Sequence, residues 1–380
     1  MFALYVHWPF CKSKCPYCDF NSHVRDGVDQ GRWQQALLDE LDHSAAELGP
    51  QKLDSIFFGG GTPTLMDPST VGVIIERATQ IWQPADDIEI TMEANPTSVE
   101  AGRFKDYAQA GVNRVSIGVQ SFLADDLKAL GREHSVDESK AVIELAAKTF
   151  PRYSFDMIYA RPQQTLKAWE LELREALSFA GDHLSLYQLT IEAGTAFHTQ
   201  YRLGELVIPN EDLASELYEL TQDIMKDAGL PQYEISNHAK PGQESRHNLT
   251  YWRYGDYAGI GPGAHGRVTI AGQKYATIRQ RLPENWLKAV AENSHALSEK
   301  VKINIDDQLK EMLLMGLRLD EGIPLTRIED LCGKSFINCI DKTRLDDLFD
   351  GGFINLDDKA IRVTHEGRQR LNAVLSHLLA

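Results

Sequence analysis

The sequence predicts an α/β protein in which a partial barrel of six βα units is followed by a small, mostly helical domain. Strand-like apolar runs alternate with segments of helical periodicity over residues 1–266, and the pattern changes to helices and one hairpin near the C-terminus. The length of 380 residues also exceeds the roughly 250–300 residues at which a single core stops growing. Two domains are therefore expected.

Six strands are expected, and each ends in polar or Gly-rich residues before the next helix. They begin at Ala3, Leu53, Ile88, Arg114, Tyr153 and His183. Helices are expected between them, for example over 32–48 and 99–110. This alternation predicts parallel strands joined by right-handed crossovers. Six units are too few to close an eight-stranded barrel, so the barrel is expected to be partial.

The C-terminal part is expected to contain a connector over 267–304 and a separate domain over 305–380. A first helix is predicted in DDQLKEMLLMGLRL, and two shorter helices follow it. FINLDDKAIRVT places two strand-like runs around an Asp357-Asp358 turn, and a last helix closes the chain. Three helices and a hairpin resemble a winged helix, but the local charge is not basic, which favours a covering or docking role over DNA binding.

Composition narrows the class of protein. A net charge of -16 argues against a nucleic-acid partner, because phosphate binding needs a basic field. No run reaches the roughly 18 apolar residues of a membrane span, and the N-terminus lacks the features of a signal peptide. We therefore expect a cytoplasmic protein. Three of the five cysteines fall within eight residues, which indicates metal binding or redox chemistry in a reducing compartment.

The most informative segment is CKSKCPYCDF, which contains Cys11, Cys15 and Cys18 directly after the first expected strand. The chemistry of α/β barrels lies at this end of the strands. Two prolines disfavour a regular helix here, so the loop can bring three thiolates together around a compact object. Three ligands suit a four-iron, four-sulfur cluster with one open iron. Zinc, with His7 or His23 as the fourth ligand, is the alternative.

The CxxxCxxC spacing, with an aromatic residue before the last cysteine, resembles the signature of radical S-adenosylmethionine (SAM) proteins. The resemblance implies that the amino and carboxylate groups of SAM chelate the open iron, and that electron transfer into the sulfonium releases a deoxyadenosyl radical. GGGTP, after the apolar run SIFF, is similar to the glycine-rich motif of this family, whose backbone contacts the methionine amino group. Three glycines allow a ligand to approach closely and expose N–H groups to a carboxylate.

Further residues match positions that contact SAM in the porphyrin-related branch of this family. Glu93 ends an expected strand, and Asp156 interrupts an apolar strand, where a carboxylate must be paired or bind a ligand. Gln120 ends the fourth strand, and Arg132, which by itself would be interpreted as a surface charge, lies in the loop beyond it. The residues expected to contact SAM are Tyr5, Tyr17, Gly60, Gly61, Thr62, Glu93, Gln120, Arg132 and Asp156.

Nearly the whole chain resembles the branch that contains oxygen-independent coproporphyrinogen III oxidase and the heme chaperones of the HemW type. The motifs that carry this resemblance are GGGTPT, MEANP, GVNRVSIGVQSF and YQLTIEAGTAF. Two features favour the chaperone. Only ten residues precede Cys11, whereas the oxidase has a sizeable N-terminal extension, and HNLTYW at 247–252 resembles the HNxxYW motif of the chaperones.

The resemblance implies a chaperone that binds heme and delivers it to a recipient hemoprotein, expected to be a respiratory one. Cluster and SAM would serve regulation or transfer, with a reductant protein as a further partner, and substrate turnover is not required. His247 is the first candidate for the heme ligand, through a neutral imidazole, with Tyr251 and Trp252 stacking on the porphyrin. His265 is the second candidate. A hydrogen-bonded structural role for either histidine remains open.

Two other functions are compatible with the sequence. The first is an oxidase that converts two propionates of coproporphyrinogen III to vinyl groups, which needs cationic anchors for four propionates, and no basic cluster is evident. The second is a zinc-stabilised interaction protein with a winged-helix domain. Cys332 and Cys339 are expected to pack in the small domain.

Overall fold

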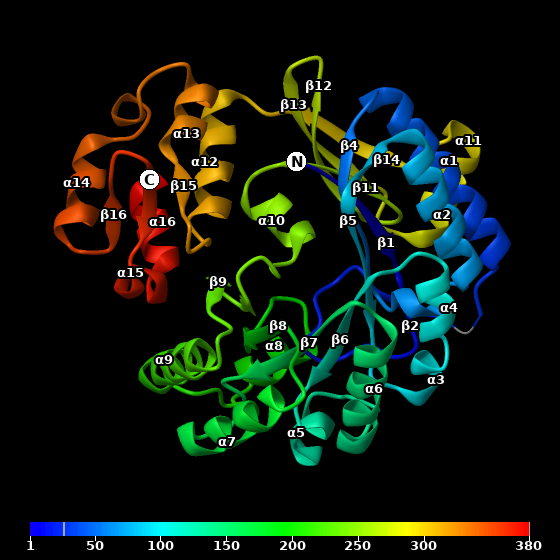
Figure 1. The fold of residues 1–380 in the computed structure, drawn as a ribbon, viewed down its shortest axis with the longest axis horizontal. Coiled ribbons are helices and arrows are strands. Elements are labelled where there is room, and N and C mark those ends of the chain that lie inside the picture. Colours follow the sequence, from blue (N-terminus) through cyan, green and yellow to red (C-terminus); the bar gives the residue numbers. More distant parts are fainter. Residues whose placement is uncertain (26, 380) are drawn as a thin grey trace.

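The computed structural model describes residues 1–25 and 27–379, and its centre is one curved sheet of twelve strands (Figure 1). Six neighbouring strands are the expected ones and pair in parallel in sequence order. They are β1 (Phe2–Trp8), β4 (Lys52–Gly60), β5 (Gln83–Ala94), β6 (Arg114–Gln120), β7 (Arg152–Tyr159) and β8 (His183–Gln188). The prediction of a partial barrel is therefore confirmed.

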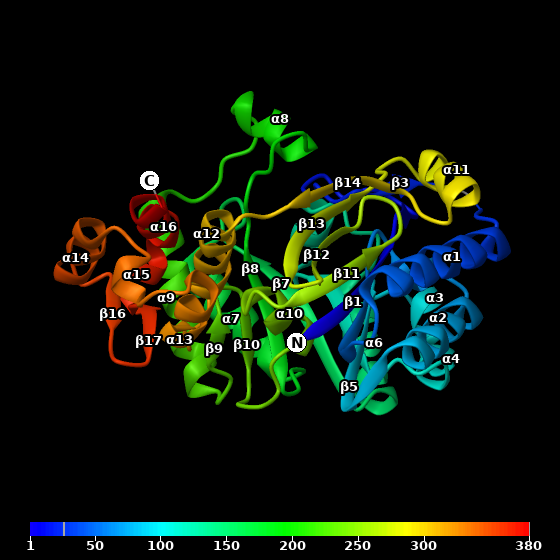
Figure 2. The ribbon, with the colours of Figure 1, turned by 90° about the horizontal axis from the view of Figure 1, so that it is seen from above.

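Helices cover the outer, convex face of this sheet, while α8 projects from the rest of the molecule (Figures 1 and 2). The covering helices are α1 (Gln30–Leu48), α2 (Pro68–Ile81), α3 (Ser98–Ala101), α4 (Phe104–Gln109), α5 (Ala124–Ala129), α6 (Val136–Thr149), α7 (Leu166–Leu177) and α9 (Glu211–Asp227), and the projecting α8 spans Ala196–Arg202. The single helix expected over 99–110 is divided into α3 and α4. Gly102 stands at the division, where a residue of low helix propensity interrupts the helix.

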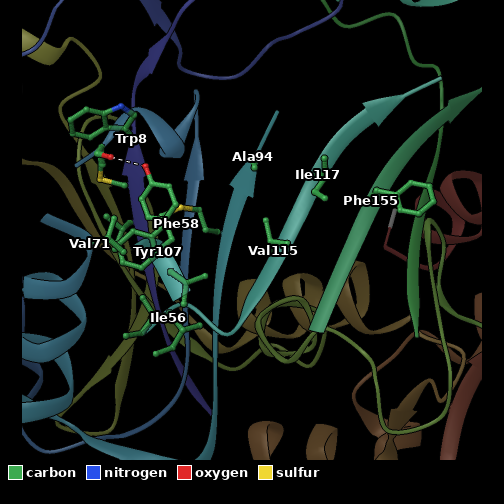
Figure 3. Close-up of a cluster of buried hydrophobic side chains, with 14 of the residues drawn as sticks. Trp8, Ile56, Phe58, Val71, Ala94, Tyr107, Val115, Ile117 and Phe155 are labelled. Atoms are coloured by element: carbon green, nitrogen blue, oxygen red, sulfur yellow. Dashed lines mark hydrogen bonds between the residues drawn. The ribbon is translucent and has the colours of Figure 1, made fainter. Parts of the chain in front are cut away.

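The main core lies between the sheet and the outer helices (Figure 3). Phe58, Val115 and Phe155 extend from three of the parallel strands and are buried. Val71 of α2 and Tyr107 of α4 belong to the same buried cluster, and the Tyr107 hydroxyl donates a 2.8 Å hydrogen bond to the Met66 carbonyl. Each buried side chain of this kind stabilises the fold by roughly 1.5–3 kcal/mol. This burial holds the strands in register, so that their carboxyl ends are presented along one edge.

Further strands extend both edges of the barrel sheet. At one edge, β11 (Asp256–Ile260) lies parallel to β1, and three antiparallel strands continue outward. These are β12 (His265–Ile270), β13 (Gln273–Arg279) and β14 (Leu297–Lys302), with α11 (Pro283–Asn293) before β14. At the other edge lie β10 (Asn237–Ala239) and β9 (Gln232–Glu234).

The segment 267–304, expected to be a connector, thus contains strands and a helix of the main sheet. Its pattern is hard to detect because β14, with the sequence LSEKVK, is almost entirely exposed and lacks apolar alternation. The domain boundaries at 266 and 305 stay predictions. The extension is joined to the barrel through Glu40 of α1. This buried carboxylate accepts hydrogen bonds from the N–H groups of Gly261 and Ala296 and from Trp286 Nε1, at 2.8–2.9 Å.

The C-terminal residues form helices around a small three-stranded sheet, and these elements have an apolar cluster of their own. The helices are α12 (Ile305–Gly316), α13 (Leu325–Cys332), α14 (Lys342–Asp350), α15 (His365–Gln369) and α16 (Leu371–Leu379). The strands are β15 (Ile323–Pro324), β16 (Ile354–Leu356) and β17 (Ala360–Val363). The expected winged-helix-like arrangement is confirmed. Within the described residues, no helix has the length and apolar content required to cross a membrane.

Candidate functional site

The carboxyl ends of the six parallel strands bring residues that are distant in sequence to one edge of the sheet. The cysteine loop follows β1, the glycine-rich turn follows β4, and Glu93 lies next to the last residue of β5. Gln120 is the last residue of β6, and Asp156 lies inside β7. Parallel pairing of these strands is what makes their ends neighbours.

The cysteine loop is closed by a short parallel pair of strands, β2 (Phe10–Cys11) and β3 (His23–Val24). Cys11 is buried, and Cys15 and Cys18 are half-buried. Burial raises the pKa of the Cys11 thiol, and the neighbouring thiols of Cys18 and Cys15 raise it further. Burial likewise raises the pKa of Cys18, with Cys15 contributing. The three thiols therefore share one site, where removal of their protons requires a cationic partner.

Three thiols from one loop are a donor set that fits an iron–sulfur cluster with one open iron. Within residues 1–25 and 27–379, no three His, Cys, Asp or Glu side chains are grouped closely enough to hold one metal ion. The thiolates of a cluster bind different irons and so stand further apart than the ligands of one ion. His7, one proposed zinc ligand, uses both ring nitrogens: Nδ1 lies 3.0 Å from the Tyr5 hydroxyl, and Nε2 lies 2.9 Å from the Asn21 carbonyl oxygen.

The glycine-rich turn holds the cysteine loop. The Gly61 N–H donates to the Trp8 carbonyl and the Thr62 N–H to the Phe10 carbonyl, both at 2.7 Å. The Gly60 N–H donates to Glu93 Oε2 at 3.1 Å. The expectation that these N–H groups are exposed to a ligand carboxylate is therefore wrong, because each has a partner inside the protein. The glycines are needed for a close approach between the two backbones.

Gly61→Ala tests this positioning role. A Cβ at Gly61 would lie 2.5 Å from the Phe10 carbonyl oxygen, so the cysteine loop has to move. We expect a loss of about 1–3 kcal/mol in unfolding free energy and a lower iron content after anaerobic reconstitution. Gly31→Ala is the matched control, because its Cβ would meet only Asp29 Oδ1 at 3.8 Å. If Gly61→Ala has the same iron content and stability as Gly31→Ala, the turn does not position the loop.

Two enclosed carboxyl groups face the interior of the barrel. Burial, together with the nearby Asp156, raises the pKa of Glu93 to about 8. Burial also raises the pKa of Asp156 to about 6, although hydrogen bonds from Ser185 and Ser116 oppose this shift. Ser116 Oγ donates to Asp156 Oδ1 at 3.2 Å. A hydrogen-bond donor placed beside Glu93 would stabilise its carboxylate, so this site is suited to a ligand amino group.

Arg132 connects the cysteine loop to the ends of β5 and β6. Its Nη1 donates to Cys15 Sγ at 3.3 Å, and its Nη2 donates to Asn95 Oδ1 at 2.6 Å and to the Gly118 carbonyl at 2.8 Å. The interpretation of Arg132 as a surface charge is wrong, because its guanidinium is enclosed by these partners. Burial raises the pKa of the Tyr17 phenol well above the usual range, and the nearby Arg132 opposes this shift. Arg132 thus holds the middle cysteine, with Tyr17 beside it.

Gln120 has an unusual backbone conformation at the end of β6. Its φ of 74° lies in the left-handed region, which costs a non-glycine residue about 1 kcal/mol or more. The register between β6 and β7 is irregular between Ile117 and Gln120. A Cβ at Gly118 would lie 3.0 Å from the Gln120 amide nitrogen and 3.4 Å from Arg132 Nη2. Gly118 thus leaves space for both side chains.

Two asparagines with central positions were missed by the sequence analysis. Asn95, in the quoted MEANP motif, donates to Thr62 Oγ1 at 3.3 Å and accepts from Arg132. Asn21, three residues after the last cysteine of the loop, donates to the carbonyls of Pro262 and Arg281 at 2.9 and 3.0 Å. Both asparagines lie in or directly after a motif at the end of a strand, and this position was the signal in the sequence that could have identified them. Asn21 joins the cysteine loop to the extended part of the sheet.

His247 is buried and hydrogen-bonded in this structure, and its assignment as a heme ligand stays a prediction. It lies in α10 (Arg246–Trp252), is 1% exposed and stacks on Phe57 with ring centroids 4.8 Å apart. Its Nδ1 lies 2.9 Å from Ser55 Oγ, and its Nε2 lies 2.7 Å from the Tyr251 hydroxyl. Both ring nitrogens are therefore engaged. The HNLTYW segment thus packs α10 against the inside of the barrel.

A cavity of about 970 Å³ opens beside these residues, a volume at the upper end of the usual range for ligand sites. The cysteine loop, the barrel interior, the extension strands, α10 and α12 all contribute to its walls. Of the residues expected to contact SAM, Tyr5, Gly60 and Glu93 line it. Tyr251, Trp252 and His265, which the sequence associated with heme, line it too. The two sets of residues thus border a single cavity.

Comparison with known proteins agrees with this arrangement. A family model described as the radical SAM superfamily matches residues 5–176, and one described as the HemN C-terminal domain matches residues 303–370. Heme chaperone HemW of Escherichia coli (strain K12) is 38% identical over 381 residues, which cover 100% of this chain and 98% of that protein. Mitochondrial radical S-adenosyl methionine domain-containing protein 1 of Mus musculus is 43% identical, over 84% of this chain and 74% of its own length.

Among solved structures, coproporphyrinogen III oxidase (HemN) from Escherichia coli superposes with a TM-score of 0.83. The match covers 99% of this chain and 89% of that one, at 22% sequence identity. At this identity the likeness establishes a common fold.

Proposed function

The chain belongs to the radical SAM superfamily and, within it, to the family of HemW-type heme chaperones, and from this membership we propose that it binds heme and delivers it to a recipient hemoprotein. The cavity of about 970 Å³ between the cysteine loop and the aromatic residues of α10 is the structural observation that carries the proposal. It offers one space bordered by the cysteine loop, residues assigned to SAM and residues suited to a porphyrin.

In this proposal Cys11, Cys15 and Cys18 hold a four-iron, four-sulfur cluster. Their shared site, with Arg132 donating to Cys15 Sγ, supports the assignment, because a cation compensates the charge of gathered thiolates. When bound, the cluster and SAM supply an electron-transfer centre that can cleave a carbon–sulfur bond. The protein encloses this centre between the cysteine loop and the strand ends.

The nine residues expected to contact SAM have two kinds of role in the proposal. Tyr5, Glu93, Gln120 and Asp156 bind the cofactor, and Glu93 accepts a hydrogen bond from its amino group. The position of Glu93 and Gln120 at the carboxyl ends of β5 and β6 supports this role, while Tyr5 and Asp156 lie within β1 and β7. The other five (Tyr17, Gly60, Gly61, Thr62 and Arg132) mainly hold the cysteine loop through the contacts described above.

The recipient is proposed to be a respiratory hemoprotein, the electron donor a reductant protein, and the location the cytoplasm. The net charge of -16 supports a protein partner over a nucleic acid. Some relatives are named as mitochondrial, so the compartment differs among members of the family.

The second candidate is coproporphyrinogen III oxidase activity, which the likeness to the fold of HemN favours. That reaction requires cationic anchors for four propionates. Two of the three arginines that line the cavity are already engaged, Arg267 by Glu311 at 2.9 Å and Arg279 by Glu40 at 3.6 Å. This shortage of available cations supports heme binding over oxidase activity.

One experiment separates the two functions. Cluster-reconstituted protein is incubated anaerobically with SAM, a reductant and coproporphyrinogen III, and the same preparation is titrated with hemin. We expect no protoporphyrinogen and a saturable change in the heme spectrum, with an authentic oxidase as the positive control. Formation of product at a catalytic rate, or the absence of heme binding by protein with an intact cluster, contradicts the chaperone proposal.

A further inference from the structure

The cavity has one wall made by the four extension strands. Because neighbouring residues of paired strands point to the same face, the pairing His265–Ile278–Glu299 places these three side chains in one row. The paired residues Tyr257 and Arg267 form an adjacent row. All five residues line the cavity. The strands thus present a flat surface that carries one histidine.

Within the described residues, His7 and His265 line the cavity, and His247 belongs to α10, which forms part of its wall; the three histidines differ in whether a ring nitrogen is available. His7 and His247 each use both nitrogens, as described above. His265 is exposed, and no side-chain hydrogen bond to its ring is found within the described part of the chain. Burial and the nearby Arg267 and Arg281 lower its pKa, which favours the neutral imidazole that binds metals.

The other walls are suited to a flat apolar ligand. Trp252 and Tyr254 contribute aromatic side chains, and a cation lies over one face of each ring: Arg318 at 4.7 Å from the Trp252 centroid and Lys274 at 4.2 Å from that of Tyr254. At the mouth, Phe20 of the cysteine loop is 57% exposed and Leu282 is 54% exposed. Large apolar side chains left exposed beside a cavity indicate a surface that a ligand or partner covers.

One cation at the cavity remains available for a carboxylate of the ligand. Arg267 and Arg279 are engaged by Glu311 and Glu40. Arg281 lines the cavity, is exposed, and has no ion-pair partner within residues 1–25 and 27–379. Because the Arg281 carbonyl accepts from Asn21, its backbone is held beside the cysteine loop. A flat apolar ligand that carries carboxylate groups along one edge fits this arrangement.

We propose that His265 is the axial ligand of the heme iron and that Arg281 pairs with a heme propionate, with the porphyrin lying in the cavity between the extension strands and α10. This inference rests on the proposed heme-binding function and specifies the site. It replaces His247 by a histidine 18 positions further along the chain, which the fold places on the cavity wall.

The test is a hemin titration of reconstituted protein followed by absorption and resonance Raman spectroscopy. In His265→Ala we expect about tenfold weaker binding and loss of the iron–histidine signature, since one coordinate bond is removed. Added imidazole should restore the signature. His377→Ala is the matched control, because His377 is an exposed residue of α16 paired with Asp347. Its heme spectrum and affinity should equal those of the unsubstituted protein.

Arg281→Gln tests the propionate contact. We expect roughly two- to fivefold weaker hemin binding, the effect of one exposed ion pair. The same substitution should not change the binding of heme dimethyl ester, which carries no propionate charge. An equal loss for both ligands would overturn the assignment of Arg281.

The outcomes separate this inference from the function on which it rests. If the unsubstituted protein does not bind hemin, the proposed function fails. If it binds hemin and His265→Ala keeps an unchanged spectrum and affinity, the function survives and His265 is not the ligand. Loss of the iron–histidine signature only in His247→Ala, with iron content and Tm unchanged, would return the ligand to α10.

Discussion

Replacement of Cys11, Cys15 or Cys18 by serine is expected to abolish the iron–sulfur cluster while leaving a folded chain. In each variant one iron loses its thiolate, and a serine hydroxyl, which ionises far less readily than a thiol, is a poor substitute. Iron content should fall from about four to below one per chain after anaerobic reconstitution, because the remaining two cysteines cannot hold the cluster. Iron and sulfide analysis with absorption spectroscopy measures this loss.

Cys332→Ser and Cys339→Ser are the matched controls for this experiment. Both cysteines are free and lie in the small C-terminal part of the chain, outside the cysteine loop. They should keep full iron content. The Tm of all five variants measured without iron should lie close together, because the main core does not depend on the loop cysteines. Full iron content in any loop variant contradicts its assignment as a ligand.

Glu93→Gln is expected to weaken SAM binding by roughly tenfold to a hundredfold, the usual cost of losing a hydrogen bond to a charged acceptor. The carboxylate would accept a hydrogen bond from the amino group of SAM, whereas the amide carries no charge. Equilibrium binding of SAM to reconstituted protein measures the loss. Glu144→Gln, at an exposed position of α6, is the control and should leave the affinity unchanged.

The raised pKa of Glu93 gives this prediction a pH dependence. With a pKa of about 8, the free protein holds Glu93 protonated at neutral pH, so a ligand amino group that donates to the Glu93 carboxylate binds only when that proton is released. Between pH 6 and 7.5 the dissociation constant should therefore fall about tenfold per unit of increasing pH. In Glu93→Gln this dependence should disappear. If the wild-type affinity does not change with pH, Glu93 does not accept a hydrogen bond from the amino group.

The raised pKa of Glu93 also predicts how the stability of the ligand-free protein depends on pH. An unfolded glutamate ionises near pH 4.5, whereas Glu93 in the folded protein keeps its proton until about pH 8. Stability is therefore lost progressively as pH rises between these two values. Glutamine has no proton to lose, so Glu93→Gln should unfold at a higher temperature than wild type at pH 8 and the difference should vanish at pH 4.

Much of the fold could be predicted because parallel barrel strands are continuous apolar runs. RVSIGVQ and LDSIFF are bounded by turn residues, so both position and type were evident. The edge strand LSEKVK was missed because its side chains are exposed and give no apolar pattern. Only its backbone hydrogen bonds to β13 make it a strand. The break between α3 and α4 at Gly102 was not predicted, because helical periodicity was judged over the whole segment 99–110.

What the sequence by itself determined is the chemistry of the site: three cysteines at a fixed spacing, a glycine-rich turn and acidic residues at strand ends. The tertiary structure decided which of these groups are available. Hydrogen bonds between residues far apart in the chain decide whether Arg132 is exposed and whether the N–H groups of the glycines are free. They also decide whether His247 or His265 has a ring nitrogen without a partner. Spacing along the chain carries no information about such partners, because they are brought together only by packing of the sheet.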